Sequence, residues 1–125
     1  MDELDALSRE VAAASDAWMV PGVDVIDDSD GGWLRICQAE PDRLLGVWAG
    51  QLYEWTDLDG IRPNLRDPVT VNALLGATGN AWQDVCGVVV WMACVDNADV
   101  VSCVDRTEAI ARAWIAAHGK EKANG

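Results

Sequence analysis

The side chains best suited to chemistry in this 125-residue sequence are carboxylates near its N-terminus. Nine acidic residues but only one basic residue, Arg9, lie between positions 2 and 30. Carboxylates can bind a divalent cation, transfer protons, or pair with basic side chains of another protein. The alternative is that they form a solvated helix face and a polar turn. The candidate surface for a protein partner consists of five aspartates: Asp16, Asp24, Asp27, Asp28 and Asp30.

Residues 27–32 are superficially similar to a calcium-binding loop. In an alignment with such a loop, Asp28 and Asp30 take positions three and five. Ile26 then falls at position one and Cys37 at position twelve, where calcium loops need carboxylates. The segment therefore predicts a plain hairpin turn, and we expect no metal site.

The other candidates for catalysis or metal binding are four cysteines and one histidine. The spacing of the cysteines includes no C-x-x-C pair of the kind that zinc sites use. Cys86, Cys94 and Cys103 fall on expected core strands, where thiols are unreactive. His118 has no nucleophile close to it in the sequence, although general acid–base catalysis usually needs such a partner. We therefore expect no catalytic residue and no cofactor, in a protein that is not an enzyme.

The whole chain is strongly acidic, with 21 Asp and Glu residues, 9 Lys and Arg residues, and a net charge of −12. This charge repels the phosphates of nucleic acid, so we expect no direct nucleic-acid binding. It complements a protein partner with a basic surface, because opposite potentials speed encounter and fix orientation. The alternative is that the acidity serves solubility or reflects the composition of the host proteome.

The composition and length predict a single domain, residues 1–125, that folds around a hydrophobic core. No apolar run approaches the roughly 20 residues needed to cross a bilayer. The N-terminal residues are acidic, whereas a secretory signal begins with positive charge. We expect a cytoplasmic protein that does not contact a membrane.

Three helices and one small antiparallel sheet of about four to six strands are expected to position these side chains, which predicts an α+β fold. Apolar residues spaced by three or four predict helices over residues 2–19, 68–82 and 106–118. Asp67-Pro68 is typical of an N-cap followed by a first-turn proline. Asp105-Arg106-Thr107-Glu108 is typical of a capping box at the start of the last helix, and Gly119 predicts its end.

The strands are predicted from β-branched runs and turn residues. Residues 23–26 and 33–37 form one expected hairpin, and residues 86–104 form another with its turn at Asn97-Ala98. That turn pairs Cys94 with Val101 and leaves both faces of the hairpin apolar. Helices are expected on one face, and a partner or a second copy of the chain on the other.

Two further segments are interpreted from their glycines and prolines. Residues 39–56 fit either a helix or a hairpin. Gly46 and Gly50 favour the hairpin, because glycine inside a helix costs about 1 kcal/mol. Residues 61–66 are interpreted as a linker, because Pro63 interrupts regular structure.

Residues 65–75, followed by Ala81-Trp82, resemble a small family of functionally uncharacterised phage and prophage proteins. Those proteins carry an aspartate-proline-alanine-threonine run, a leucine pair and a later alanine-tryptophan. A strand hairpin then leads to a threonine-glutamate-alanine helix, as Thr107-Glu108-Ala109 does here. Residues 17–22 are similar to a tryptophan-methionine-proline-glycine segment near their start, so the resemblance covers about residues 17–118.

The chain departs from that pattern at two positions. Val69 stands where the family usually has alanine, and Val20 is an additional residue before the proline. The resemblance implies a viral or prophage context, which would place the protein in the cytoplasm of a host cell. It brings no catalytic residues to this chain.

Charge and resemblance together predict a non-enzymatic, acidic, phage-type protein that binds a protein partner. Such a protein could act as an inhibitor or nucleic-acid mimic on a basic host or defence protein. Carboxylates would replace phosphates, and exposed tryptophans would anchor the complex. The alternative is a structural or self-assembling accessory protein, such as a homodimer, with no inhibitory role.

Overall fold

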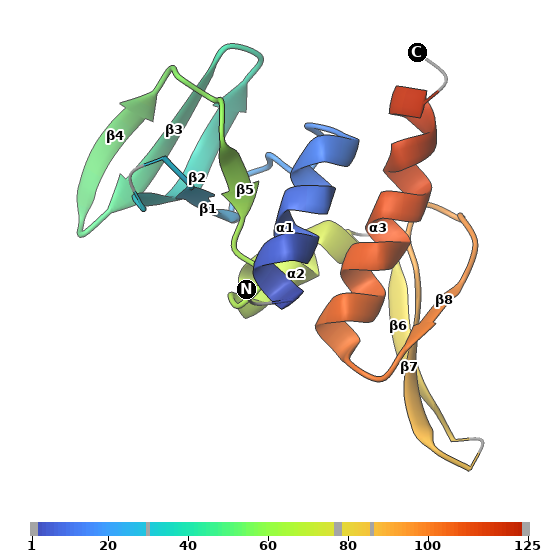
Figure 1. The fold of residues 1–125 in the computed structure, drawn as a ribbon. Helices are drawn as coiled ribbons and strands as arrows, with labels where there is room; N and C mark the ends of the chain where they lie inside the picture. The colour runs from blue at the N-terminus through green and yellow to red at the C-terminus, as the bar shows by residue number, and fades with distance from the viewer. Residues whose placement is uncertain (1–2, 30, 77–78, 86, 124–125) are drawn as a thin grey trace.

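The computed structural model describes residues 3–29, 31–76, 79–85 and 87–123. Within these residues, three helices and two antiparallel sheets confirm the predicted α+β fold (Figure 1). The helices lie between the two sheets. The elements in chain order are α1 (Glu3–Ala14), β1 (Asp24–Asp27), β2 (Trp33–Glu40), β3 (Arg43–Trp48), β4 (Gln51–Trp55), β5 (Ile61–Pro63), α2 (Pro68–Leu75), β6 (Asn80–Val85), β7 (Val89–Cys94), β8 (Val101–Cys103) and α3 (Arg106–Ala123).

The larger sheet has the strand order β4-β3-β2-β1-β5. Its first four strands follow one another as neighbours, and β5 returns to pair with the free side of β1. Along β2, Leu34 and Ile36 are buried while Arg35 is exposed, the alternation expected of a strand with one face on a core. A Cβ atom on Gly46 would lie 2.5 Å from Leu34 Cγ, so glycine there lets the leucine side chain pack directly on the β3 backbone.

The smaller sheet has the order β6-β7-β8, and α3 packs against one of its faces. Ala93 and Val95 are buried on that side, together with Ile110 and Trp114 of α3. The opposite face includes the exposed side chain of Trp82, which pairs across the sheet with Met92. Helix α3 therefore covers one face of this sheet, and Trp82 is exposed on the other.

The predicted hairpin within residues 39–56 is confirmed. β3 pairs with β4 through a bend at Ala49-Gly50, and both bend residues have positive φ angles, of 51° and 80°. The hairpin over residues 23–37 is confirmed as well, as β1 and β2. Glycines and turn residues were sufficient to predict both.

The first helix is shorter than the predicted range of residues 2–19, because α1 ends at Ala14. Ser15 Oγ accepts a hydrogen bond from Ala17 N at 3.1 Å, and such local bonds compete with helical ones. Trp18 lies beyond the helix but is only 2% exposed. Trp18 thus reaches the core as an apolar residue of the predicted helix would, although it lies outside α1.

The predicted second helix over residues 68–82 is also too long, since α2 ends at Leu75. Gly76 follows with a φ of 71°, a conformation that terminates helices and favours glycine. Residues 80–85 form β6 and pair with β7 along their whole length. Pairing with β7 therefore makes this segment a strand, although Trp82 fits the helical spacing of the apolar residues before it. Thr78, which was expected on the helix, lies outside the described residues.

The hairpin predicted over residues 86–104 exists, but the predicted register is wrong by one residue. Val101 pairs with Ala93 and not with Cys94. Asp96-Asn97 takes positive φ angles of 51° and 59°, so the bend begins one residue earlier than the predicted two-residue turn. A shift by one residue moves side chains to the opposite face, and Val101 consequently packs on the core.

Two other boundaries differ from prediction. Residues 61–66, interpreted as a linker, include β5; Pro63 is tolerated there because β5 is an edge strand. α3 continues beyond Gly119 to Ala123, because this glycine keeps a helical backbone. Cys86, expected on a core strand, lies outside the described residues.

The caps of α2 and α3 provide a first prediction. Asp67 Oδ2 accepts hydrogen bonds from Thr70 N at 3.1 Å and Thr70 Oγ1 at 2.8 Å, and Asp67 also pairs with Arg35. We expect Asp67→Ala to lower the free energy of unfolding by about 1–2 kcal/mol, measured by urea denaturation. Asp105→Ala removes a simpler cap, a single bond from Glu108 N, and should cost less. Equal losses in the two variants would contradict this ranking.

Candidate functional site

A cleft of about 810 Å³ lies between the C-terminal end of α1, the segment after it and the larger sheet. Its apolar wall comes from Trp18, Met19, Ala39, Leu58 and Ile61. Its charged side chains are Arg9, Asp16, Asp28, Glu40, Asp59 and Arg62. Because carboxylates outnumber guanidinium groups in this lining, we call it the acidic cleft.

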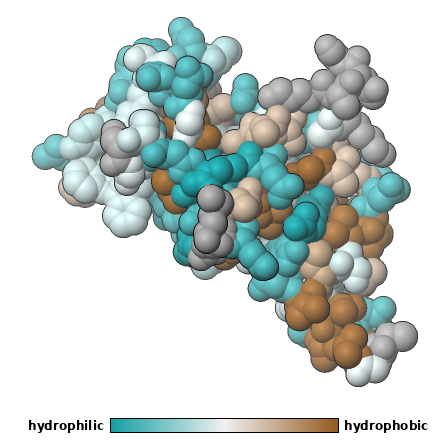
Figure 2. All heavy atoms as spheres, in the orientation of Figure 1, coloured by the Kyte–Doolittle hydropathy of each residue, from teal (hydrophilic) through white to brown (hydrophobic). Residues whose placement is uncertain are grey.

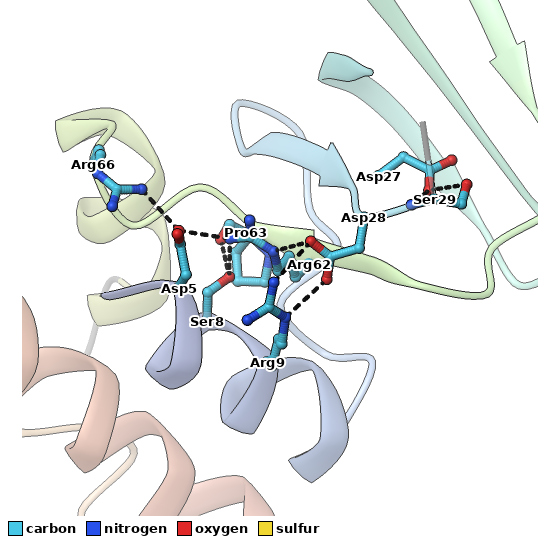
Figure 3. A network of polar contacts seen from close by, with 9 residues as sticks. All are labelled: Asp5, Ser8, Arg9, Asp27, Asp28, Ser29, Arg62, Pro63 and Arg66. Carbon is cyan, nitrogen blue, oxygen red and sulfur yellow. Dashed lines mark hydrogen bonds and ion pairs between the residues drawn. The ribbon is translucent and has the colours of Figure 1, made fainter. Parts of the chain in front are cut away.

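Arg62 organises one side of the acidic cleft. The residue is only 7% exposed, and its guanidinium reaches from β5 to α1 and to the loop after β1 (Figure 3). Nε donates to Asp28 Oδ1 at 2.8 Å, and Nη1 donates to Asp5 Oδ1 at 3.3 Å and to Ser8 Oγ at 3.3 Å. Ser8 Oγ donates in turn to the carbonyl oxygen of Pro63. A buried arginine is thereby supplied with acceptors from two other elements.

Two more arginines complete this network at the surface. Arg9 Nε donates to Asp28 Oδ2 at 3.0 Å, and Arg66 Nη1 donates to Asp5 Oδ1 at 2.8 Å. The hydrogen bond from Arg9, with that from Arg62, holds the pKa of Asp28 below its ordinary value. The hydrogen bond from Arg66, with the positive charges of Arg62 and Arg66, does the same for the pKa of Asp5. Both carboxylates therefore stay charged to a lower pH than an ordinary aspartate does.

The structure brings together only part of the predicted partner surface. Asp16 and Asp28 both line the acidic cleft. Asp24 accepts instead from Asn64 Nδ2 at 3.0 Å, and Asp27 Oδ1 accepts from the backbone and hydroxyl of Ser29. Those two aspartates therefore stabilise local structure. Asp30 lies outside the described residues.

Sequence reasoning missed four residues of the acidic cleft: Trp18, Glu40, Asp59 and Arg62. They come from three separate segments, around Trp18, around Glu40 and over residues 58–62, that the tertiary fold unites. Asp59 lies in a turn, where its backbone N donates to Asp57 Oδ1 at 3.2 Å. No pattern in the sequence links these positions.

All seven arginines of the chain bind side chains of the chain itself. Arg43 pairs with Glu40 and Glu54, and Arg112 pairs with Glu108. Arg106 donates to Asn72 Oδ1 and lies 5.7 Å from the ring centroid of Trp91. Within the described residues, by contrast, the carboxylates of Asp16 and Asp59 make no ion pair. These two aspartates are available to an external cation.

The lining of this cleft does not include Cys37, Cys94, Cys103 or His118. Cys37 is exposed, and burial raises the pKa of the partly buried Cys103 thiol. His118 Nε2 lies 3.1 Å from Asp96 Oδ2, and its ring stacks on Trp114 with centroids 4.4 Å apart. Among the described residues, no three His, Cys, Asp or Glu side chains are grouped as a metal site would require. None of the described helices is long and apolar enough to cross a membrane.

Comparisons of the chain with models of known protein families, with curated proteins and with solved structures gave no match. The resemblance of residues 17–118 to phage and prophage proteins therefore stays a prediction. The acidic cleft is the feature from which function can be inferred.

Removing Arg62 should destabilise the fold. Arg62→Met leaves Asp5 and Asp28 facing a buried apolar group, although each keeps one surface arginine. We expect a loss of about 2–3 kcal/mol in the free energy of unfolding, measured by urea denaturation. The matched control is Arg43→Met, which removes an exposed guanidinium and should cost at most about 1 kcal/mol. A smaller loss for Arg62→Met than for the control would show that the network does not support the fold.

The lowered pKa values of Asp5 and Asp28 predict loss of stability in acid. Their contribution is fully present above the unfolded-state value of about 3.9 and is lost as pH falls through the lower folded-state values. Unfolding free energies of the wild type should therefore fall steeply below about pH 4. The double variant Asp5→Asn/Asp28→Asn should be less stable at pH 7 and show a shallower acid slope. Asp99→Asn controls for the loss of one exposed charge, and an unchanged slope in the double variant would refute the assignment.

Proposed function

We propose that this chain is a non-enzymatic binding protein whose acidic cleft engages a basic segment of a protein partner. The observation that carries the proposal is the combination of an apolar wall with two carboxylates, Asp16 and Asp59, that have no basic partner among the described residues. An arginine or lysine of the partner would supply that missing charge. Its aliphatic stem would lie on the apolar wall.

The indole of Trp18 offers a further contact. This side chain lines the acidic cleft, and its buried Nε1 has no hydrogen-bond partner among the described residues. A buried donor without an acceptor costs free energy, about 1–3 kcal/mol for a typical group. A main-chain carbonyl of a bound segment would satisfy it if the wall opened slightly on binding. Trp18 thereby supports an extended peptide as the occupant.

Inhibition would follow from occupying a basic surface that a host or defence protein uses for nucleic acid. In such an inhibitor, carboxylates would take the place of nucleic-acid phosphates. Asp28 is already paired with Arg9 and Arg62. A carboxylate already neutralised by two arginines is a poor substitute for a phosphate. We therefore assign the electrostatic role to Asp16 and Asp59, with overall charge steering the encounter.

An affinity capture with the tagged protein tests this role. Asp16→Asn/Asp59→Asn is compared with Asp84→Asn/Asp99→Asn, which removes the same charge from exposed sites outside the cleft. We expect the wild type and the control to retain one basic protein that is released at high salt, and the cleft variant to lose it. Equal retention by both variants, or binding that salt does not weaken, would contradict the proposal.

Self-assembly is the second candidate, and the end of the β6–β7 hairpin favours it. Val85, Val88 and Val89 are 72%, 67% and 50% exposed, and β6 is an edge strand. Figure 2 shows this apolar surface in brown at the lower right, beyond α3. Edge strands with apolar side chains tend to pair with further strands. Sedimentation equilibrium of the purified wild type decides this point, because a strictly monomeric mass would rule the candidate out.

A further inference from the structure

A second concave surface lies at the far end of the larger sheet. It is a groove of about 300 Å³ whose lining includes Trp33, Trp48, Tyr53 and Trp55 together with neighbouring glycines and Leu34. We call these four rings the aromatic groove. They are half of the eight aromatic residues of the chain, seven Trp and one Tyr. Trp55 also packs against the hydrophobic core, whereas Trp33, Trp48 and Tyr53 are not among the described residues that form it.

The strand register explains how three of the rings share a face. Tyr53 pairs with Gly46, and Trp55 pairs with the buried Leu44. Trp48 is two residues beyond Gly46 on the same strand, so its side chain points to the same side of the sheet. The aromatic groove is therefore the continuation of the core face of β3 and β4.

Three of the four rings remain substantially exposed at this end of the sheet. Trp33, Trp48 and Tyr53 are 55%, 47% and 38% exposed. Trp48 and Tyr53 contact each other with centroids 6.2 Å apart and planes inclined by 59°, which leaves parts of both ring faces accessible. Exposed apolar surface gathered at one site commonly marks a binding site.

Charge indicates which ligand fits. The lining of the aromatic groove contains no charged side chain among the described residues, and the chain as a whole carries −12. Arg43, the arginine on β3, is already held by Glu40 and Glu54. Ring faces carry negative potential and attract cations, most often the guanidinium of arginine. The negative field of the chain adds to that attraction and disfavours anions.

We propose that the aromatic groove binds an arginine side chain of a peptide segment by cation–π contact. The proposal rests on the proposed function for the origin of that segment, which would be the same basic partner. It adds a second anchoring point, separate in residues from the acidic cleft. Two anchors on one partner would raise affinity through effective concentration.

The test uses a free peptide, acetyl-Gly-Arg-Gly-Arg-Gly-amide, and its counterpart with citrulline in place of arginine. Citrulline has nearly the same shape without the charge. The indole N–H signals of the protein are followed by NMR during titration with each peptide. We expect the arginine peptide to shift signals of the groove tryptophans and to bind about tenfold more tightly than the citrulline peptide.

Three variants locate the binding. Trp48→Leu should weaken binding of the arginine peptide about tenfold, whereas Trp82→Leu, an exposed tryptophan on β6, should leave it unchanged. Tyr53→Leu should weaken it as well, which guards against a local effect of a single substitution. Unfolding curves verify that each variant is folded.

Several outcomes would overturn the proposal. These are equal binding of the citrulline peptide, equally tight binding of a neutral proline-rich peptide, and unchanged binding in Trp48→Leu and Tyr53→Leu. Loss of the peptide only in Asp16→Asn/Asp59→Asn would place it in the acidic cleft, which refutes the groove and leaves the proposed function intact. Conversely, arginine binding at the groove without partner capture by the acidic cleft would refute only the proposed function.

Discussion

The buried guanidinium of Arg62 is the interaction on which the arrangement of this protein depends. It lies on β5, the last strand of the larger sheet, and is held by carboxylates from α1 and from the loop after β1. A buried charge is costly unless its partners are in place, so these three elements are constrained together. The helices thereby acquire a defined position against the sheet. The acidic cleft lies beside this junction and owes one side to Arg62 itself.

Pairing between arginines and carboxylates also determines which negative charges at the surface stay unpaired. Arginine is the main basic residue of the chain, with seven Arg against two Lys. Its planar guanidinium binds carboxylates in defined geometry, and six of the seven arginines pair with one or more nearby acids. The acids that remain, such as Asp16 and Asp59, determine the character of the external field. An acidic protein of this kind presents specific carboxylates and not a uniform negative coat.

The tryptophans divide in a similar way between structure and surface. Trp18 and Trp114 are almost completely buried, whereas Trp33 and Trp48 are about half exposed. Trp114 lies on α3 and Trp18 follows α1, whereas Trp33 and Trp48 lie on β2 and β3 of the larger sheet, which extends away from the helices (Figure 1). An aromatic groove and an acidic cleft on the same small protein are complementary features, since arginine can pair with carboxylates and also stack on rings.

The sequence by itself determined the features of the fold that depend only on residues close together in the chain. The cap at Asp67 and the hairpins within residues 23–37 and 39–56 follow from capping and turn residues that act on neighbouring residues, and the structure confirms each. The tertiary structure decided what requires a distant partner. Strand pairing with β7 placed residues 80–82, the end of the predicted helix 68–82, in β6, and the bend at Asp96-Asn97 set the register. The acidic cleft belongs to this second group, because strand pairing and burial bring Trp18 and Glu40 together with the segment that carries Asp59 and Arg62.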